Sequence, residues 1–244
     1  MPARGGSEAS ARVRRVGIVA ALRAEARTLP ARRGGTLADG SLLAVSGMGA
    51  AAAAHSAREL LAAGAGALAS WGFAGGLDPA LAPGSLLLAE EVIDSAGRLL
   101  QARSAWRERL AQALAGECAC AHGRLLSAEQ ILATVEEKRA RQRASGAAAV
   151  DLESFAIAAV ASQAGVPFLC VRVIVDGAGD ELPQAVLRAT RADGTLRAAW
   201  LAAQWLRAPR ELGGALLRLA GRYGAAQRTL RLAARPGLLA SCLV

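Results

Sequence analysis

The sequence predicts an α/β fold, in which a mainly parallel sheet is covered by helices on both faces. Short apolar runs bounded by turn residues alternate with segments of helical pattern along most of the chain. The 244 residues suit one large domain, and the 27 glycines supply many positions for tight turns and close backbone contacts. We therefore expect a single compact core.

The elements are predicted in the following order. Residues 1–15 are polar and rich in glycine and arginine, which predicts a disordered leader. Seven apolar runs then predict strands, at 15–22, 42–49, 66–76, 85–93, 123–127, 147–153 and 166–180. The helices expected between them are Ala50 to Ala63, Ser104 to Ala115, Ala133 to Arg143, and Ser154 to Gln163. The glycines within residues 60–77 favour a strand and a loop over a membrane-spanning helix.

The charge pattern divides the chain into a main domain at 16–195 and a basic, amphipathic helical extension at 196–244. The net charge of +9 comes almost wholly from arginine, since Lys138 is the only lysine. From residue 185 onward, the sequence contains ten arginines but only two acidic residues, Asp193 and Glu211. This excess suits a membrane surface as well as a solvated helix face, and the tail carries no nucleic-acid-binding motif.

The cysteines predict a reduced, cytoplasmic protein without a metal site. Four cysteines show no disulfide-framework spacing, and the chain starts with no signal-peptide pattern. The run from Cys118 through Cys120 to His122 supplies too few ligands, at unusual spacing, for a closed zinc site.

Carboxylates in apolar surroundings identify a candidate site. Asp151 and Glu153 interrupt an otherwise apolar segment, and buried acidic side chains require partners. Glu25 and Asp176 also follow predicted strands, and the loop "GFAGG" follows another. In open α/β sheets, ligands bind beyond the carboxyl ends of the strands, so we expect these groups to converge there.

Four separated segments resemble the nucleoside phosphorylase and nucleosidase superfamily, especially bacterial enzymes that cleave methylthioadenosine and adenosylhomocysteine. The segments are "VGIVAALRAEARTL", "SGMG", "GFAGGLDPALAPGSLLLAEEVI" and "VDLESFAIAAVASQAGVPFLCVRVIVDGAGD". The resemblance implies a three-layer αβα sandwich with a mixed, mostly parallel sheet. It also implies a homodimer and catalysis without a metal or organic cofactor, with phosphate as a possible cosubstrate.

A narrower resemblance concerns the substrate. The variant "GFAGGLDPALAPG", the segment "DELPQAVL" and the tail rich in arginine, leucine and tryptophan look most like the hopanoid-associated phosphorylase group. That group is linked to the removal of adenine from adenosylhopane, a triterpenoid joined to the 5′ carbon of adenosine. The resemblance thus implies a lipid-linked nucleoside substrate and an enzyme in the cytoplasm or at the inner membrane surface.

The resemblance also implies roles for the polar residues. Glu153 would accept hydrogen bonds from the ribose hydroxyls, and Asp176 would protonate the departing adenine at N7. Glu25 would activate the attacking water, with Arg172 near that nucleophile. The residues alone leave other interpretations open: a helix-start carboxylate, a turn-forming Asp-Gly pair, a solvated helical turn and a structural ion pair.

Apolar residues and glycines complete the expected pocket. Phe73 stands where the methylthioadenosine enzymes have a serine, so its ring cannot donate a hydrogen bond to water or phosphate. Hydrolysis and phosphorolysis therefore both remain open. Six other positions match the family's pocket: Met48, Gly75, Gly76, Ile131, Leu132 and Leu152. Each of them could instead pack in the core or form a turn.

The tail has two competing interpretations. Trp200 and Trp205 lie among leucines at helical spacing, with arginines at the opposite positions. This pattern is typical of a helix in a membrane interface, but also of helices packed on the sheet with a solvated arginine face. The rival functions are a methylthioadenosine/adenosylhomocysteine nucleosidase, a futalosine-cleaving enzyme and a non-catalytic peripheral membrane protein.

Overall fold

The computed structural model describes residues 15–30, 34–182, 184–189, 209–235 and 237–243. The strands are β1 (Val16–Ala20), β2 (Leu42–Val45), β3 (Ala67–Gly76), β4 (Leu86–Asp94), β5 (Leu99–Gln101), β6 (Cys120–Ser127), β7 (Ala149–Asp151) and β8 (Phe168–Asp176). The helices are α1 (Arg23–Ala26), α2 (Ala50–Ala62), α3 (Ser104–Leu114), α4 (Val135–Ser145), α5 (Ser154–Gln163), α6 (Gln184–Ala189), α8 (Pro209–Ala233) and α9 (Leu238–Ser241).

The eight strands of the described residues form one mixed sheet; a mixed sheet was expected, whereas β5 is additional to the seven predicted strands. The strand order is β2-β1-β3-β7-β6-β4-β5, and β8 pairs with both β3 and β4. Five pairings are parallel, whereas β3–β7, β4–β5 and β4–β8 are antiparallel. Because β3 is long, it pairs with β1 near its start and with β7 near its end, so it carries residues directly from the core to the carboxyl edge of the sheet.

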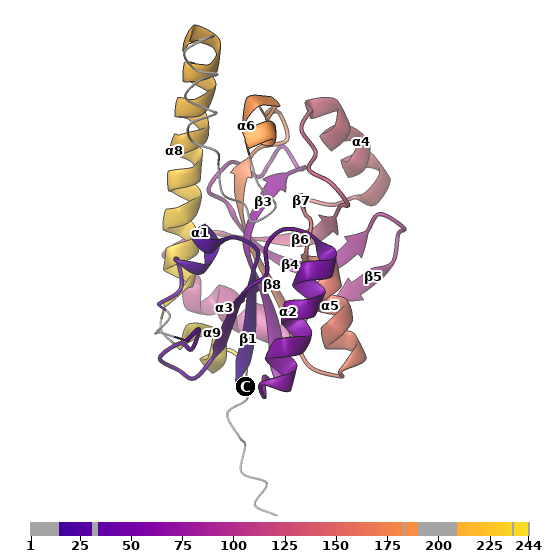
Figure 1. Ribbon diagram of the computed structural model, residues 1–244, viewed down its shortest axis with the longest axis vertical. Coiled ribbons are helices and arrows are strands. Elements are labelled where there is room, and N and C mark those ends of the chain that lie inside the picture. Colours follow the sequence, from indigo (N-terminus) through magenta and orange to yellow (C-terminus); the bar gives the residue numbers. More distant parts are fainter. Residues whose placement is uncertain (1–14, 31–33, 183, 190–208, 236, 244) are drawn as a thin grey trace, which may run out of the picture.

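Helices cover both faces of the sheet, which confirms the three-layer prediction (Figure 1). Helices α2 and α5 bury Ala57 and Ile157 against one face. On the other face, Trp106 of α3 and Leu230 of α8 share a core with Trp71 of β3. The indole of Trp106 also donates to the Leu239 carbonyl of α9 at 2.9 Å, which fastens the end of the chain to this layer.

The C-terminal part of α8 packs on the sheet. Ala226, Leu230 and Ala233 are fully buried, and the Thr229 hydroxyl donates to the Gly84 carbonyl at 2.9 Å. The other end of α8 extends past the carboxyl edge of the sheet (Figure 1), and there the Leu217 side chain is 77% exposed. Helix packing on the core, one of the two interpretations of the tail, therefore accounts for this part of α8.

The remaining expectations for the chain ends lie outside the described residues. These are the leader, apart from Arg15, and the two tryptophans at positions 200 and 205. In the described part of the chain, no helix combines the length and apolarity needed to cross a membrane.

Candidate active site

One cavity of about 160 Å³ lies at the carboxyl edge of the sheet. Glu25 of α1, Glu153 at the start of α5 and Asp176 at the end of β8 all line it. These carboxylates are separated by up to 151 positions in the sequence, yet they meet because β1 and β8 run parallel to β3 toward the same edge, where the antiparallel β7 pairs with the last residues of β3. The predicted convergence of these three groups is found in the structure.

The Glu25 carboxylate is buried and held by two backbone donors. The amide N–H of Leu22 donates to Oε2 at 2.7 Å, and that of Phe73 donates to Oε1 at 2.8 Å. Burial raises the pKa of Glu25, although the nearby Arg172 guanidinium and these amide donors oppose the rise. A carboxyl with a raised pKa, fixed at a cavity wall, suits a general base.

Gly72 of β3 permits the close approach of Glu25 and Arg172. A Cβ atom at this position would lie 2.5 Å from Arg172 Nη1 and still closer to Glu25 Oε1. Any side chain at position 72 would therefore displace the two charged groups. Their displacement would break the hydrogen bonds from Phe73 to Glu25 and from Arg172 to Asp151.

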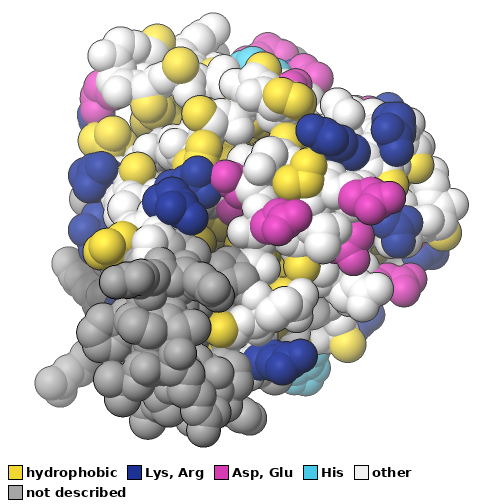
Figure 2. Space-filling view, turned by 90° about the horizontal axis from the view of Figure 1, so that it is seen from above, with side chains coloured by type: hydrophobic (Ala, Val, Ile, Leu, Met, Phe, Trp, Pro, Cys, Tyr) yellow, Lys and Arg dark blue, Asp and Glu magenta, His cyan; other side chains and the backbone are white. Residues whose placement is uncertain are grey.

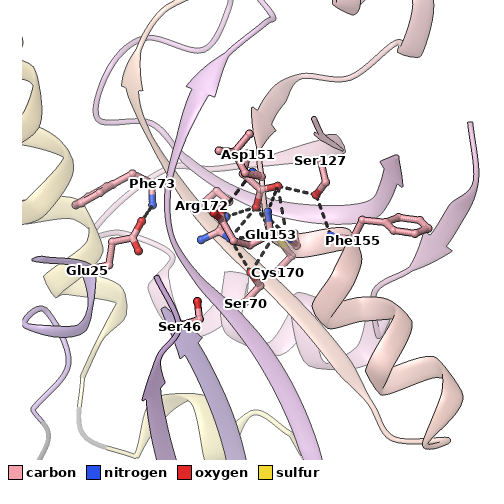
Figure 3. A network of polar contacts seen from close by, with 12 residues as sticks. Glu25, Ser46, Ser70, Phe73, Ser127, Asp151, Glu153, Phe155, Cys170 and Arg172 are labelled. Atoms are coloured by element: carbon pink, nitrogen blue, oxygen red, sulfur yellow. Dashed lines mark hydrogen bonds and ion pairs between the residues drawn. The ribbon is translucent and has the colours of Figure 1, made fainter. Parts of the chain in front are cut away.

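Arg172 forms a buried ion pair with Asp151 and does not line the cavity. Its Nε donates to Asp151 Oδ2 at 2.9 Å, and its Nη2 donates to the hydroxyls of Ser70 at 2.7 Å and Ser154 at 3.0 Å (Figure 3). Asp151 raises the pKa of Arg172 above its usual value despite the burial. Of the two interpretations of Arg172, the ion pair is the one that the contacts describe.

Asp151 also organises the start of α5. It accepts hydrogen bonds from the Ser127 hydroxyl at 2.6 Å and from the amide of Ser154 at 3.1 Å. Acidic side chains are favourable at helix N-termini, where backbone N–H groups lack partners within the helix. Its buried carboxylate is therefore satisfied by the protein itself.

Glu153 has a different environment. The amide of Gly49 donates to its Oε1 at 2.8 Å, the amide of Leu152 donates to its Oε2 at 3.3 Å, and the residue lines the cavity. Burial, followed by the neighbouring Asp151 carboxylate, raises the pKa of Glu153 to about 7. Such a carboxylate has acceptor capacity left for hydroxyl groups of a ligand.

Asp176 is paired with a residue that sequence reasoning missed. Lys138 of α4 is completely buried, and its Nζ donates to Asp176 Oδ2 and to the carbonyls of Gly177 and Asp180. The sequence feature that could have drawn attention to Lys138 is its residue type, because it is the one lysine among 29 lysines and arginines. Burial raises the pKa of Asp176, and Lys138 opposes this effect most strongly.

Most of the expected apolar positions also line the cavity. Those that do are Met48, Phe73, Gly75, Ile131, Leu132 and Leu152, whereas Gly76 and Arg172 do not. Lining residues that the sequence did not single out are Ala21, Leu22, Ala74, Gln130, Val150, Val175 and Leu182. The Phe73 ring also lies against Tyr223 of α8, with ring centroids 5.2 Å apart, so α8 supports one wall of the site.

The charged groups of the lining all have the same sign. Among the described residues they are four carboxylates, those of Glu25, Asp151, Glu153 and Asp176. On the outer surface at this end of the molecule, acidic and basic side chains of the described residues are interspersed (Figure 2). The acidic character is therefore a property of the cavity.

Comparisons with known proteins agree with this fold. The chain resembles the 5′-methylthioadenosine/S-adenosylhomocysteine nucleosidase of Neisseria meningitidis in complex with methylthio-immucillin-A, with a TM-score of 0.65, 18% identity, and coverage of 91% of this chain and 97% of that one. For the 5′-methylthioadenosine/S-adenosylhomocysteine nucleosidase of Helicobacter pylori with butyl-thio-DADMe-Immucillin-A, the TM-score is 0.63 and the identity 19%, with coverage of 89% of this chain and 96% of that one. For the native futalosine hydrolase of Helicobacter pylori, the TM-score is 0.61 and the identity 18%, with coverage of 86% of this chain and 98% of that one.

No curated protein sequence matches the chain. The family model described as "Phosphorylase superfamily" matches residues 9–207, which is most of the chain. On this match and on its fold, the chain belongs to the phosphorylase superfamily.

Proposed function

We propose that the protein cleaves the N-glycosidic bond of a 5′-substituted adenosine and releases adenine. The observation that carries the proposal is the presence of Glu25, Glu153 and Asp176 in one cavity. The reaction needs an acceptor for the sugar hydroxyls, an acid for the base and a base for the nucleophile, and each carboxylate can fill one of these roles.

In the proposed mechanism, Glu153 accepts hydrogen bonds from the ribose 2′ and 3′ hydroxyls and thereby orients the sugar. Asp176 gives a proton to N7 of adenine as the electron pair of the C1′–N9 bond moves into the purine. Glu25 removes a proton from the nucleophile, which attacks C1′. Arg172 acts indirectly, because its ion pair with Asp151 fixes the start of α5 and therefore the neighbouring Glu153.

Water is the proposed nucleophile. Phosphate is anionic, and the described lining offers it four carboxylates but no arginine or lysine. Arg23, the first residue of α1 and the arginine nearest to Glu25 in the sequence before it, is exposed and does not line the cavity, so it offers no contact to phosphate there. Phe73 has a phenyl ring where the resemblance leads to a serine hydroxyl, and its only hydrogen-bond donor, the backbone N–H, already donates to Glu25.

Adenosylhopane is the proposed substrate. The narrower resemblance of the sequence supports this choice, and so does Ile131, which lines the cavity and is 40% exposed. An apolar 5′ substituent could cover this side chain on its way out of the site. We also propose a homodimer that works in the cytoplasm or at the inner membrane surface, where a lipid substrate would be found.

A methylthioadenosine/adenosylhomocysteine nucleosidase is the second candidate. It is favoured by the apolar lining, since Phe73, Val175 and Leu182 would also accommodate a small thioether group.

Product analysis tests the proposal. Purified protein is incubated with adenosylhopane or methylthioadenosine, with and without phosphate, and adenine and the sugar product are identified by mass spectrometry. We expect ribosylhopane at a rate that does not depend on phosphate. Phosphoribosylhopane formed only with phosphate would contradict hydrolysis. Faster turnover of methylthioadenosine would favour the second candidate, and no adenine from either substrate would overturn the proposed activity.

A further inference from the structure

Lys138 is chemically unusual in this chain. Every other basic position among 29 lysines and arginines is an arginine, yet the one lysine is fully buried. A buried ammonium group is costly unless it is paired and fully hydrogen-bonded. The retention of a lysine at this single position therefore calls for a local reason.

The local contacts provide that reason. The Nζ group has three protons to donate, and it meets three acceptors: Asp176 Oδ2, the Gly177 carbonyl at 2.9 Å and the Asp180 carbonyl at 2.9 Å. The tetrahedral ammonium group suits acceptors that surround one point, whereas the planar guanidinium group of arginine presents its donors in a flat fork. Lysine thus fits a position that arginine does not.

The same contacts tie the cavity wall to the loop that follows β8. Asp180 Oδ2 accepts the Gly177 amide at 2.7 Å and pairs with Arg222 of α8 at 2.8 Å. Of the two carboxylate oxygens of Asp176, only Oδ2 accepts a hydrogen bond from the described residues. Asp176 also lines the cavity. Oδ1 is therefore the oxygen left for a ligand.

We propose that Lys138 is a positioning residue for Asp176, which fixes its carboxyl group in the cavity wall and stabilises the carboxylate that forms when the proton passes to adenine. This inference rests on the proposed function. The O–H bond of Asp176 breaks, a bond from that proton to N7 forms, and the C1′–N9 electron pair enters the purine. The new negative charge on Asp176 lies against the ammonium group. After adenine leaves, Glu25 releases to solvent the proton that it took from the nucleophile, and Asp176 takes up one proton from solvent.

The inference predicts a change in acid strength. The charged groups that face Asp176 are Lys138 of α4, Asp180 of the loop and Arg222 of α8, and Lys138 has the largest lowering effect on its pKa. Replacement of Lys138 by methionine removes that effect, so the pKa of Asp176 rises and its carboxyl becomes a weaker acid. The loss of activity at high pH, which follows deprotonation of Asp176, then moves to higher pH.

Two substrates separate this role from a purely structural one. One is the 5′-substituted adenosine that the wild-type protein cleaves, and the other is 4-nitrophenyl β-D-ribofuranoside, whose phenolate leaves without protonation. For Lys138→Met we expect at least a ~10-fold loss of kcat on the adenosine substrate, in keeping with the size of general-acid effects, and at most a ~2-fold loss on the nitrophenyl substrate. The matched control is Arg139→Met, which removes an exposed charge from the same helix and should change neither rate.

Equal losses on both substrates, or an unchanged high-pH limit, would overturn the inference. Lys138→Arg keeps the positive charge and should still lose adenine release, because the guanidinium group cannot meet the three acceptors. Lys138→Gln keeps two donors and provides a folded protein should the methionine variant not fold.

A measurement without turnover keeps the inference separate from the proposed function. The titration of Asp176, one of seven aspartates in the chain, is followed by ¹³C NMR of labelled carboxyl groups and assigned with Asp176→Asn. An upward pKa shift in Lys138→Gln supports the inference even if the wild-type protein releases no adenine, and an unchanged titration refutes it.

Discussion

Arg172 Nη2 lies 2.7 Å from Asp151 Oδ2 in a buried ion pair. Asp151 is two positions before Glu153, which lines the cavity. The two carboxylates of the segment "DLE" therefore have separate partners. Asp151 is satisfied by Arg172, Ser127 and the start of α5, whereas Glu153 keeps acceptor capacity toward the cavity. The first holds the backbone that presents the second.

Asp151→Asn tests this division. The amide keeps the shape of the side chain but removes the charged partner to which the buried Arg172 guanidinium is hydrogen-bonded. We expect the free energy of unfolding to fall by about 3–5 kcal/mol, the usual cost of breaking a buried pair from one side. Urea denaturation measures it, with Asp39→Asn, at a half-exposed turn position, as control. A loss below about 1 kcal/mol would show that the pair does not hold this region together.

Gly72→Ala tests the close approach of Glu25 and Arg172. The added Cβ would overlap both side chains, so we expect Glu25 to be displaced and adenine release to fall by at least ~100-fold, the range for loss of a general base. Enzyme assays and urea denaturation measure the two effects. The matched control is Gly221→Ala in α8, where a Cβ meets nothing within 4 Å and should stabilise the helix slightly. Full activity of Gly72→Ala would refute the packing argument.

The sequence predicted the regular parts of the fold well because their patterns are long. The predicted helix at 154–163 has the same bounds as α5, and the long apolar runs around positions 70 and 170 correspond to β3 and β8. The three-residue β5 and the four-residue α1 were missed, since so few residues show no periodicity. Their formation depends on neighbours that are distant in the sequence.

The site was predictable to a similar degree. Glu25, Glu153 and Asp176 were recognisable because each follows an apolar strand run. The partner of Asp176 was not, because Lys138 belongs to α4, whose sequence "VEEKRARQRAS" is polar on all sides and indicates a solvated helix. Its burial follows from where the loop after β8 lies, which no local pattern encodes. Similarly, the partner of Arg172 became evident only when β7 and β8 were placed together.

Two leucines of α8 test how this helix is attached. Leu230 is fully buried, whereas Leu217 is 77% exposed on the same helix. We expect Leu230→Ala to lower the free energy of unfolding by about 2–5 kcal/mol and Leu217→Ala to lower it by less than about 0.5 kcal/mol. Urea denaturation compares them. Equal small effects would mean that α8 is not docked on the sheet in solution.

The pH dependence of stability tests the environment of Glu153. Its pKa is about 7 in the folded protein, above the usual value of 4.5, because burial and the Asp151 carboxylate disfavour its charged form. Between these two values, the folded state binds more protons than the unfolded state. The contribution of Glu153 to stability is therefore present below about pH 4.5 and is lost as the pH rises through about 7, which amounts to about 3 kcal/mol.

Glu153→Gln removes this titration. We expect the variant to unfold at higher urea concentration than the wild type at pH 8 and to lose that advantage progressively toward pH 5. The comparison of the two proteins at each pH cancels the contributions of the other ionisable groups, since only position 153 differs. Adenine release should be weak in the variant at every pH, because an amide accepts ribose hydroxyls less strongly than a carboxylate does. A stability difference that stays constant from pH 5 to pH 8 would mean that Glu153 titrates normally and that its carboxylate is not desolvated at the cavity wall.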